Sequence, residues 1–227
     1  MVGGRRATCG ADRIFRRRDL VESLMKLSDI QPALDEIQRN PRILDLRAIT
    51  YIATYPSLRA FGKSSLPIDG DRFSQLVVMA YGWMPRIVRV DQGCVGDAKS
   101  AVQIAAQATV HTGLKKSAML NLARCLRSVV GASKVLHFVN DEIFPIWDSG
   151  VEAFRLGGVL PYNHMNNVDN YFAYCNEVHA IRAEEGFRDF LGGINAAMDA
   201  RLAALFIDPY PISEVRAIEV AAFELAE

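Results

Sequence analysis

The sequence lacks the features that would assign it at once to a specialised class of protein. Its 227 residues include only four cysteines, scattered and without a Cys-x-x-Cys pair, so we expect free thiols and not a disulfide framework. Lys plus Arg and Asp plus Glu are equal at 26 each, which argues against a dedicated polyanion binder, because such proteins usually carry a basic excess. The longest apolar run, Leu76 to Met84, is about half of the roughly 20 residues that a membrane helix needs.

The start of the chain lacks the pattern of a secretion signal. Met1 to Asp12 is rich in Gly and Arg and has no apolar centre. Together with the free thiols, this predicts a protein of the reducing cytoplasm that does not associate with a membrane. Half of the residues are apolar and 23% are charged, which is typical of a globular domain and not of a disordered chain.

Residues 1–18 are polar and basic, with Arg5-Arg6 and the triplet at 16–18. We predict a flexible N-terminal segment, because chain ends are usually loose unless they dock. The alternative is an arm that contacts phosphates or another anion.

Helical periodicity dominates the remainder, so residues 19–227 are predicted to form a single all-α domain. A sub-domain boundary would fall in the turn-rich connector at 62–70 (GKSSLPIDG). Pro56 is expected to end the first clear helix, and Gly131 to interrupt the apolar stretch around it. The predicted helices span about 44–56, 71–83, 97–110, 114–130, 132–139, 148–156, 187–205 and the residues from 213 onward.

Motifs for common enzyme chemistries are absent. The chain has no HExxH, GxSxG, GxxxxGK[ST] or strand-linked GxGxxG pattern, so neither a metal nor a cofactor is expected. The polar loop at 161–170 (PYNHMNNVDN) offers Tyr162, Asn163 and His164 as candidate ligand contacts. Its alternative interpretation is a loop whose Asn and Asp side chains hydrogen-bond their own backbone.

Asp148 is distinguished by its neighbours, since it follows Phe144-Pro145-Ile146-Trp147 and opens a predicted helix. A carboxylate in that position accepts backbone N–H bonds, so a plain N-cap and a catalytic acid both fit the pattern. Asp141 and Glu142, a few residues earlier, are expected to face solvent.

Residues 126–157 (LRSVVGASKVLHFVNDEIFPIWDSGVEAFRLG) resemble the core of the helix-hairpin-helix DNA glycosylases. The similar pieces are the hairpin at 129–131, the FPIWD segment at 144–148 and the RLG segment at 155–157. The resemblance implies a helix-hairpin-helix glycosylase-like fold that binds duplex DNA through hairpin N–H groups. It also implies that the target base is flipped out of the stack and that Asp148 stabilises charge developing on the sugar.

The resemblance carries over to particular residues. Asp148 and Lys134 would be the catalytic carboxylate and amine. The DNA-binding residues would be Gly131, Ser133, Lys116, Arg124 and Arg127. This chain departs from the family pattern in having one hairpin glycine and no hairpin proline, and its lysine lies about one residue late.

Three functional hypotheses therefore stand. The first is a divergent DNA-repair protein that binds DNA and excises a damaged base. The second is a non-catalytic helical interaction protein with a degenerate hairpin, for which the sequence names no protein partner. The third is a small-molecule enzyme that uses the loop at 161–170.

Overall fold

A computed structural model describes residues 25–40, 45–83 and 88–226, and within them every regular element is helical. The predicted all-α class is thereby confirmed, whereas the basic segment at 1–18 lies outside the described residues. No helix in the described ranges combines the length and the apolar character that crossing a membrane requires.

The elements follow one another with short connections. The first half comprises α1 (Leu27–Ile30), α2 (Ala33–Arg39), α3 (Leu46–Ser64), α4 (Gly70–Gly82), the 3₁₀ turn η1 (Gln92–Cys94) and α5 (Val95–Ala106). The second half comprises α6 (Lys116–Leu126), α7 (Val129–Val139), α8 (Ser149–Leu156), η2 (His164–Asn166), α9 (Val168–Ile181), α10 (Phe187–Ala204) and α11 (Glu214–Glu224).

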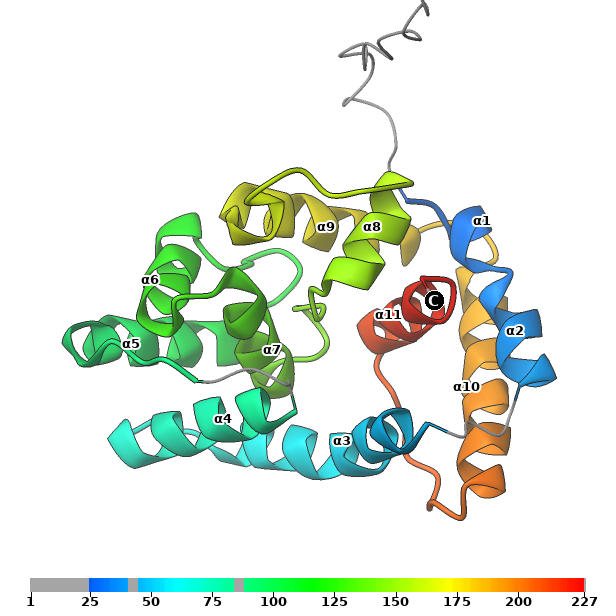
Figure 1. Ribbon diagram of the computed structural model, residues 1–227, viewed down its shortest axis with the longest axis horizontal. Helices are drawn as coiled ribbons and strands as arrows, with labels where there is room; N and C mark the ends of the chain where they lie inside the picture. The colour runs from blue at the N-terminus through cyan, green and yellow to red at the C-terminus, as the bar shows by residue number, and fades with distance from the viewer. Residues whose placement is uncertain (1–24, 41–44, 84–87, 227) are drawn as a thin grey trace, which may run out of the picture.

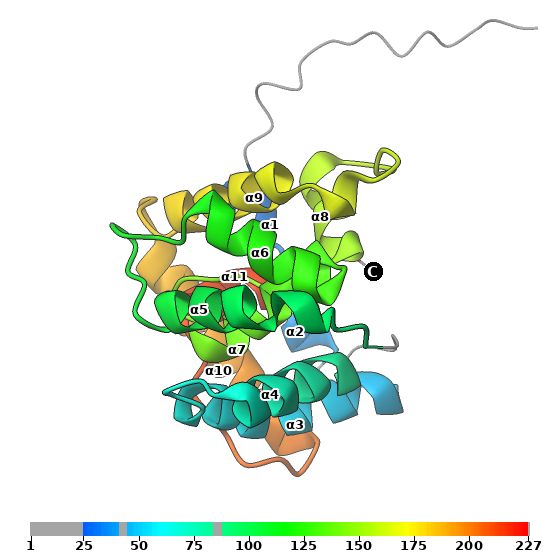
Figure 2. The same cartoon turned by 90° about the vertical axis from the view of Figure 1, so that its left-hand side faces the viewer.

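Helix α7 forms the centre of one half of the molecule. Ten of its residues are buried, and it packs against α3, α4, α5 and α6. Figure 1 shows α2 and α10 on the opposite side, with α11 between the two groups of helices. In Figure 2, α5 and α6 face the viewer and α7 lies behind them. One continuous apolar core connects the groups, running from Met25 to Ala222 and including residues on both sides of the 62–70 connector.

Pro56 lies inside α3, so the prediction that it ends the helix is wrong. A proline within a helix leaves the carbonyl four residues earlier without its usual donor. That carbonyl belongs to Ile52, and the Tyr210 hydroxyl donates to it at 2.9 Å. A tertiary contact thus replaces the missing backbone bond and allows α3 to continue to Ser64.

Gly131 does not interrupt its helix, because α7 begins at Val129 and includes it. Ser128 supplies the cap that starts this helix early. Helix α9 is absent from the sequence-based predictions, although Asn167 caps it and accepts the Asp169 N–H at 2.9 Å. The abundance of turn-forming residues just before Val168 concealed this start.

The last turn of α3 approaches α7 very closely. Gly62 is buried there, and a Cβ built on it would overlap the backbone carbonyl of Phe138. The connector predicted at 62–70 therefore begins inside a helix, at the point where two backbones meet.

Candidate functional site

Helices α6 and α7 meet in a tight hairpin. Arg127 ends α6 in the left-handed conformation (φ 52°), and Ser128 is the N-cap of α7. The Ser128 hydroxyl accepts the Gly131 N–H at 2.9 Å, and the Tyr81 hydroxyl donates to the Leu126 carbonyl at 3.0 Å. A Cβ on Gly131 would overlap that Tyr81 hydroxyl. Gly131 therefore packs against Tyr81, and its N–H group already has an acceptor.

The predicted DNA-contacting cations lie along α6 and its end. Lys116 pairs with Asp169 at 2.6 Å, and the 64%-exposed Arg127 side chain pairs with Asp91 at 2.9 Å. Arg124 is exposed and forms no ion pair with any described residue. Exposed ion pairs of this kind contribute only about 0–1 kcal/mol, so a phosphate group can compete for both paired cations.

Asp148 is half-buried and caps α8, where one of its oxygens accepts the Gly150 N–H at 2.8 Å. The preceding residue, Trp147, donates its backbone N–H to the Ser133 hydroxyl at 3.1 Å. Because Ser133 precedes Lys134 directly, this bond brings the segments that carry Lys134 and Asp148 side by side. Ser133 donates in turn to the Val130 carbonyl at 2.8 Å, which ties the same point to the start of α7.

Lys134 belongs to a group of cations and rings that we name the Trp83 cluster: Tyr51, Tyr55, Trp83, Lys134 and Arg216. The Lys134 ammonium lies 5.7 Å from the Trp83 ring centre, and the Arg216 guanidinium lies 5.8 Å from it. Arg216 also lies 4.7 Å from the Tyr55 ring. Two cations therefore share one half-buried indole, within the range of cation–π attraction.

Arg216, Tyr51 and Tyr55 are not among the site residues predicted from the sequence. Arg216 comes from α11 and the tyrosines from α3, so they lie far from Lys134 along the chain. No local pattern marks them, because only the packing of α3 and α11 beside α7 brings them together.

Buried polar groups hold the Arg216 side of the cluster in place. Glu219 is 2% exposed and accepts from Arg216 at 2.9 Å. It also accepts the Ile146 N–H and lies 3.3 Å from His137 Nδ1. Burial pushes the pKa of Glu219 upward, but His137 and Arg216 outweigh it and keep that pKa below its ordinary value.

Asp141 is fully buried, so the expectation that it faces solvent is wrong. Arg59 and Lys63 each approach its carboxylate to 2.7 Å. Burial raises the pKa of Asp141, but these two cations and His137 more than offset it and hold the pKa below the usual value. Glu142, in contrast, is exposed, as predicted.

We expect Glu219→Gln to weaken the loss of folding stability at acidic pH. Because the pKa of Glu219 is lower in the folded state than the ordinary 4.5, its contribution to stability is present above that value. The contribution is lost as the pH falls through the folded-state pKa. Urea unfolding between pH 3 and pH 7 should therefore show a shallower fall below about pH 4.5 for the variant than for the wild type. Parallel curves for the two proteins would contradict the prediction.

The loop at 161–170 is anchored by His164. Its Nε2 lies 2.5 Å from the buried Glu152 carboxylate, and Asn170 donates to its Nδ1 at 3.0 Å. Both ring nitrogens therefore have hydrogen-bond partners. Tyr162, by contrast, is 95% exposed, and Asn163 has a left-handed backbone (φ 60°). The loop and the start of α6 line an open groove.

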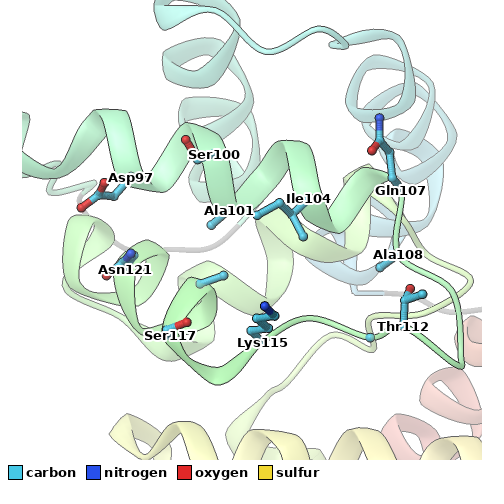
Figure 3. A pocket seen from close by; sticks show the side chains of 12 residues that line it. Asp97, Ser100, Ala101, Ile104, Gln107, Ala108, Thr112, Lys115, Ser117 and Asn121 are labelled. Carbon is cyan, nitrogen blue, oxygen red and sulfur yellow. The ribbon is translucent and has the colours of Figure 1, made fainter.

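A second groove lies between α5 and α6, and Figure 3 shows it from close by. Asp97 and Ser100 line it from α5, and Ser117 and Asn121 from α6. None of the site residues predicted from the sequence lines this groove. In the part of the chain that the structure describes, no three His, Cys, Asp or Glu side chains are grouped so that they could hold a metal ion.

Known proteins give no further guide to these features. The function is therefore inferred from the hairpin, the Trp83 cluster and the half-buried Asp148. No protein-family model matches the chain, and no curated protein or solved structure does so either.

Proposed function

We propose that this chain is a divergent DNA-glycosylase-like protein that binds duplex DNA and excises a damaged base. The observation that carries the proposal is the Trp147–Ser133 hydrogen bond of 3.1 Å, which brings the Asp148 and Lys134 segments together beside the α6–α7 hairpin. A carboxylate and an amine on adjacent segments are the two groups that base excision with strand cleavage uses.

The residues around Asp148 and Lys134 provide contacts of the kind that nucleic acids make. Lys134 and Arg216 supply positive charge next to the half-buried Trp83 ring, and aromatic rings that reach the surface stack on bases regardless of sequence. Arg124 and Arg127 lie exposed at the hairpin, where they can meet phosphates without reading sequence. Asp148 has one carboxylate oxygen that makes no hydrogen bond with the described residues and remains available to a reacting sugar.

The decisive experiment removes the negative charge of Asp148 and keeps its role as the N-cap of α8. Asp148→Asn keeps an equally good N-cap, so the variant should fold normally while losing the negative charge. We expect excision from duplexes carrying oxidised, alkylated or deaminated bases to fall at least about tenfold, a loss of about 1.4 kcal/mol of transition-state stabilisation.

The proposed role of Lys134 as an amine nucleophile is tested by incubating the protein with borohydride and a duplex that carries a single abasic site. Its amine would add to the sugar aldehyde with loss of water, and reduction of the resulting imine would leave the protein covalently attached. Lys134→Gln should abolish this product, whereas Lys115→Gln, at an exposed lysine outside the Trp83 cluster, should leave it unchanged. Excision and trapping that persist in both site variants would refute the catalytic assignment.

The non-catalytic interaction protein is the second candidate. The Gly131 N–H favours this candidate, because it already donates to the Ser128 hydroxyl and is not available to a DNA phosphate. Duplex binding at 50 and 200 mM salt distinguishes the two, because phosphate contacts release counterions and weaken steeply with salt. Binding that is absent or independent of salt would favour this second candidate. No specific observation favours the loop enzyme, because both ring nitrogens of His164 are engaged.

A further inference from the structure

Two cysteines, Cys94 and Cys125, meet at one backbone oxygen beside the hairpin. The Asp91 carbonyl accepts the Cys94 N–H at 3.0 Å and the Cys125 thiol at 3.5 Å. Asp91 in turn donates its N–H to the Cys125 carbonyl at 2.8 Å. The Cα of Cys94 lies about 1.5 Å beyond its nitrogen, so it falls within about 8 Å of the Cys125 sulfur. The Cys125 sulfur is therefore a near neighbour of Cys94, and a disulfide between them requires their Cα atoms to be about 4.4–6.8 Å apart.

The structure assigns Cys94 and Cys125 as a dithiol pair that a hydroperoxide oxidises to a disulfide within the folded protein. The bond would link η1 to the last turn of α6. This site is separate from the excision chemistry and does not depend on it.

The two thiols differ in accessibility, which gives the reaction an order. Cys94 is half-exposed, whereas Cys125 is fully buried. Burial, and after it the neighbouring Cys94, raises the pKa of Cys125, so its thiolate is scarce and reacts slowly with an oxidant from solution. Cys94 is therefore the thiol that meets the oxidant first, and Cys125 resolves the product.

The steps balance without any further reagent. The Cys94 thiolate attacks one peroxide oxygen, the O–O bond breaks, and a sulfenic acid and one water (or alcohol) result. The Cys125 thiolate then attacks the sulfenic sulfur, the S–O bond breaks, and a second water leaves. The two thiols together lose two electrons and two protons, and the peroxide gains them.

The Cys94–Cys125 disulfide would also affect Arg127, the residue at the turn between α6 and α7. Asp91 is the partner of Arg127, and both cysteines hold Asp91 through its backbone. A disulfide would fix Asp91 beside Arg127 and keep that cation paired. If the proposed DNA binding is correct, oxidation should therefore weaken it, and this readout alone depends on the proposed function.

The test is peptide mapping of the full chain carrying Cys9→Ser, which removes the cysteine outside the described residues. The protein is treated with hydrogen peroxide, free thiols are blocked, and trypsin is added. Cleavage after Arg89, Lys99, Arg124 and Arg127 releases Cys94 in peptide 90–99 and Cys125 in peptide 125–127. We expect these two peptides joined, with a mass two hydrogens below their sum, and the joined species should disappear in Cys94→Ser.

Cys175 is the matched control within the same chain. It is buried, and burial raises its pKa to about 12, so it should stay reduced in peptide 156–182.

Oxidation should also raise Tm by several degrees, because the link closes a loop of about 30 residues. Separate peptides 90–99 and 125–127 after treatment, or a link that forms only in urea, would overturn the assignment. A joined species without any effect on DNA binding would leave the dithiol site standing and count against the DNA role of Arg127.

Discussion

Gly62→Ala should lower the free energy of unfolding by about 3 kcal/mol or more, measured by urea unfolding at pH 7. The added methyl group would overlap the Phe138 carbonyl, which belongs to the backbone of α7 and cannot rotate away. Helix α3 or α7 must therefore shift, and ten of the eleven residues of α7 are buried. Such a rigid neighbour makes overpacking costly.

Gly192→Ala is the matched control for this substitution. Gly192 also lies inside a helix, α10, but a Cβ added there meets nothing within 4 Å. Alanine at that position should stabilise the protein by about 0.4–1 kcal/mol through its better helix propensity. Equal effects at both glycines would mean that the approach of α3 to α7 is not as close as described.

Arg155→Met should cost about 3–5 kcal/mol of folding stability. Arg155 is 8% exposed and connects two buried carboxylates, with nitrogens 2.7 Å from Glu152 and 2.5 Å from Glu177. Methionine fills a similar volume but leaves both acids without their cation. Burial pushes the pKa of Glu152 upward, and Arg155 is the main group that outweighs burial and keeps that pKa below the ordinary value. At Glu177 burial already prevails and the pKa is raised, although Arg155 opposes it. Without Arg155 the desolvation of both acids is therefore less well compensated.

Two further variants identify the cause of that loss. The Arg188 side chain is 82% exposed and pairs with Glu214 at 2.8 Å, so Arg188→Met should change stability by less than about 1 kcal/mol. Combining Arg155→Met with Glu152→Gln and Glu177→Gln should recover part of the stability, because no uncompensated charge then remains buried. A triple variant as unstable as the sum of its parts would show that packing, and not charge, is lost with Arg155.

The sequence predicted well those features that depend on neighbouring residues. The apolar periodicity located most of the helices, and Asp148 caps the start of α8 as its position suggested. The predictions failed where a distant residue decides the outcome. Pro56 stays within α3 because Tyr210 replaces the missing donor.

The candidate site divides in the same way. Lys134 and Asp148 could be named from a segment of about 30 residues, because a short stretch of chain carries both. Arg216 and Tyr55 could not, since they join the Trp83 cluster only through the packing of α11 and α3. Asp141 was misjudged because its two cationic partners, Arg59 and Lys63, lie on α3, far from it along the chain.

The bond from Tyr210 to α3 also bears on how the chain acquires its shape during synthesis. A ribosome releases α3 long before residue 210 emerges, so the Ile52 carbonyl must first make its hydrogen bond with water. The nascent helix is then weakest at its proline and can open or bend there. We infer that the hydrogen bonding of α3 is completed late, when the C-terminal segment docks against it.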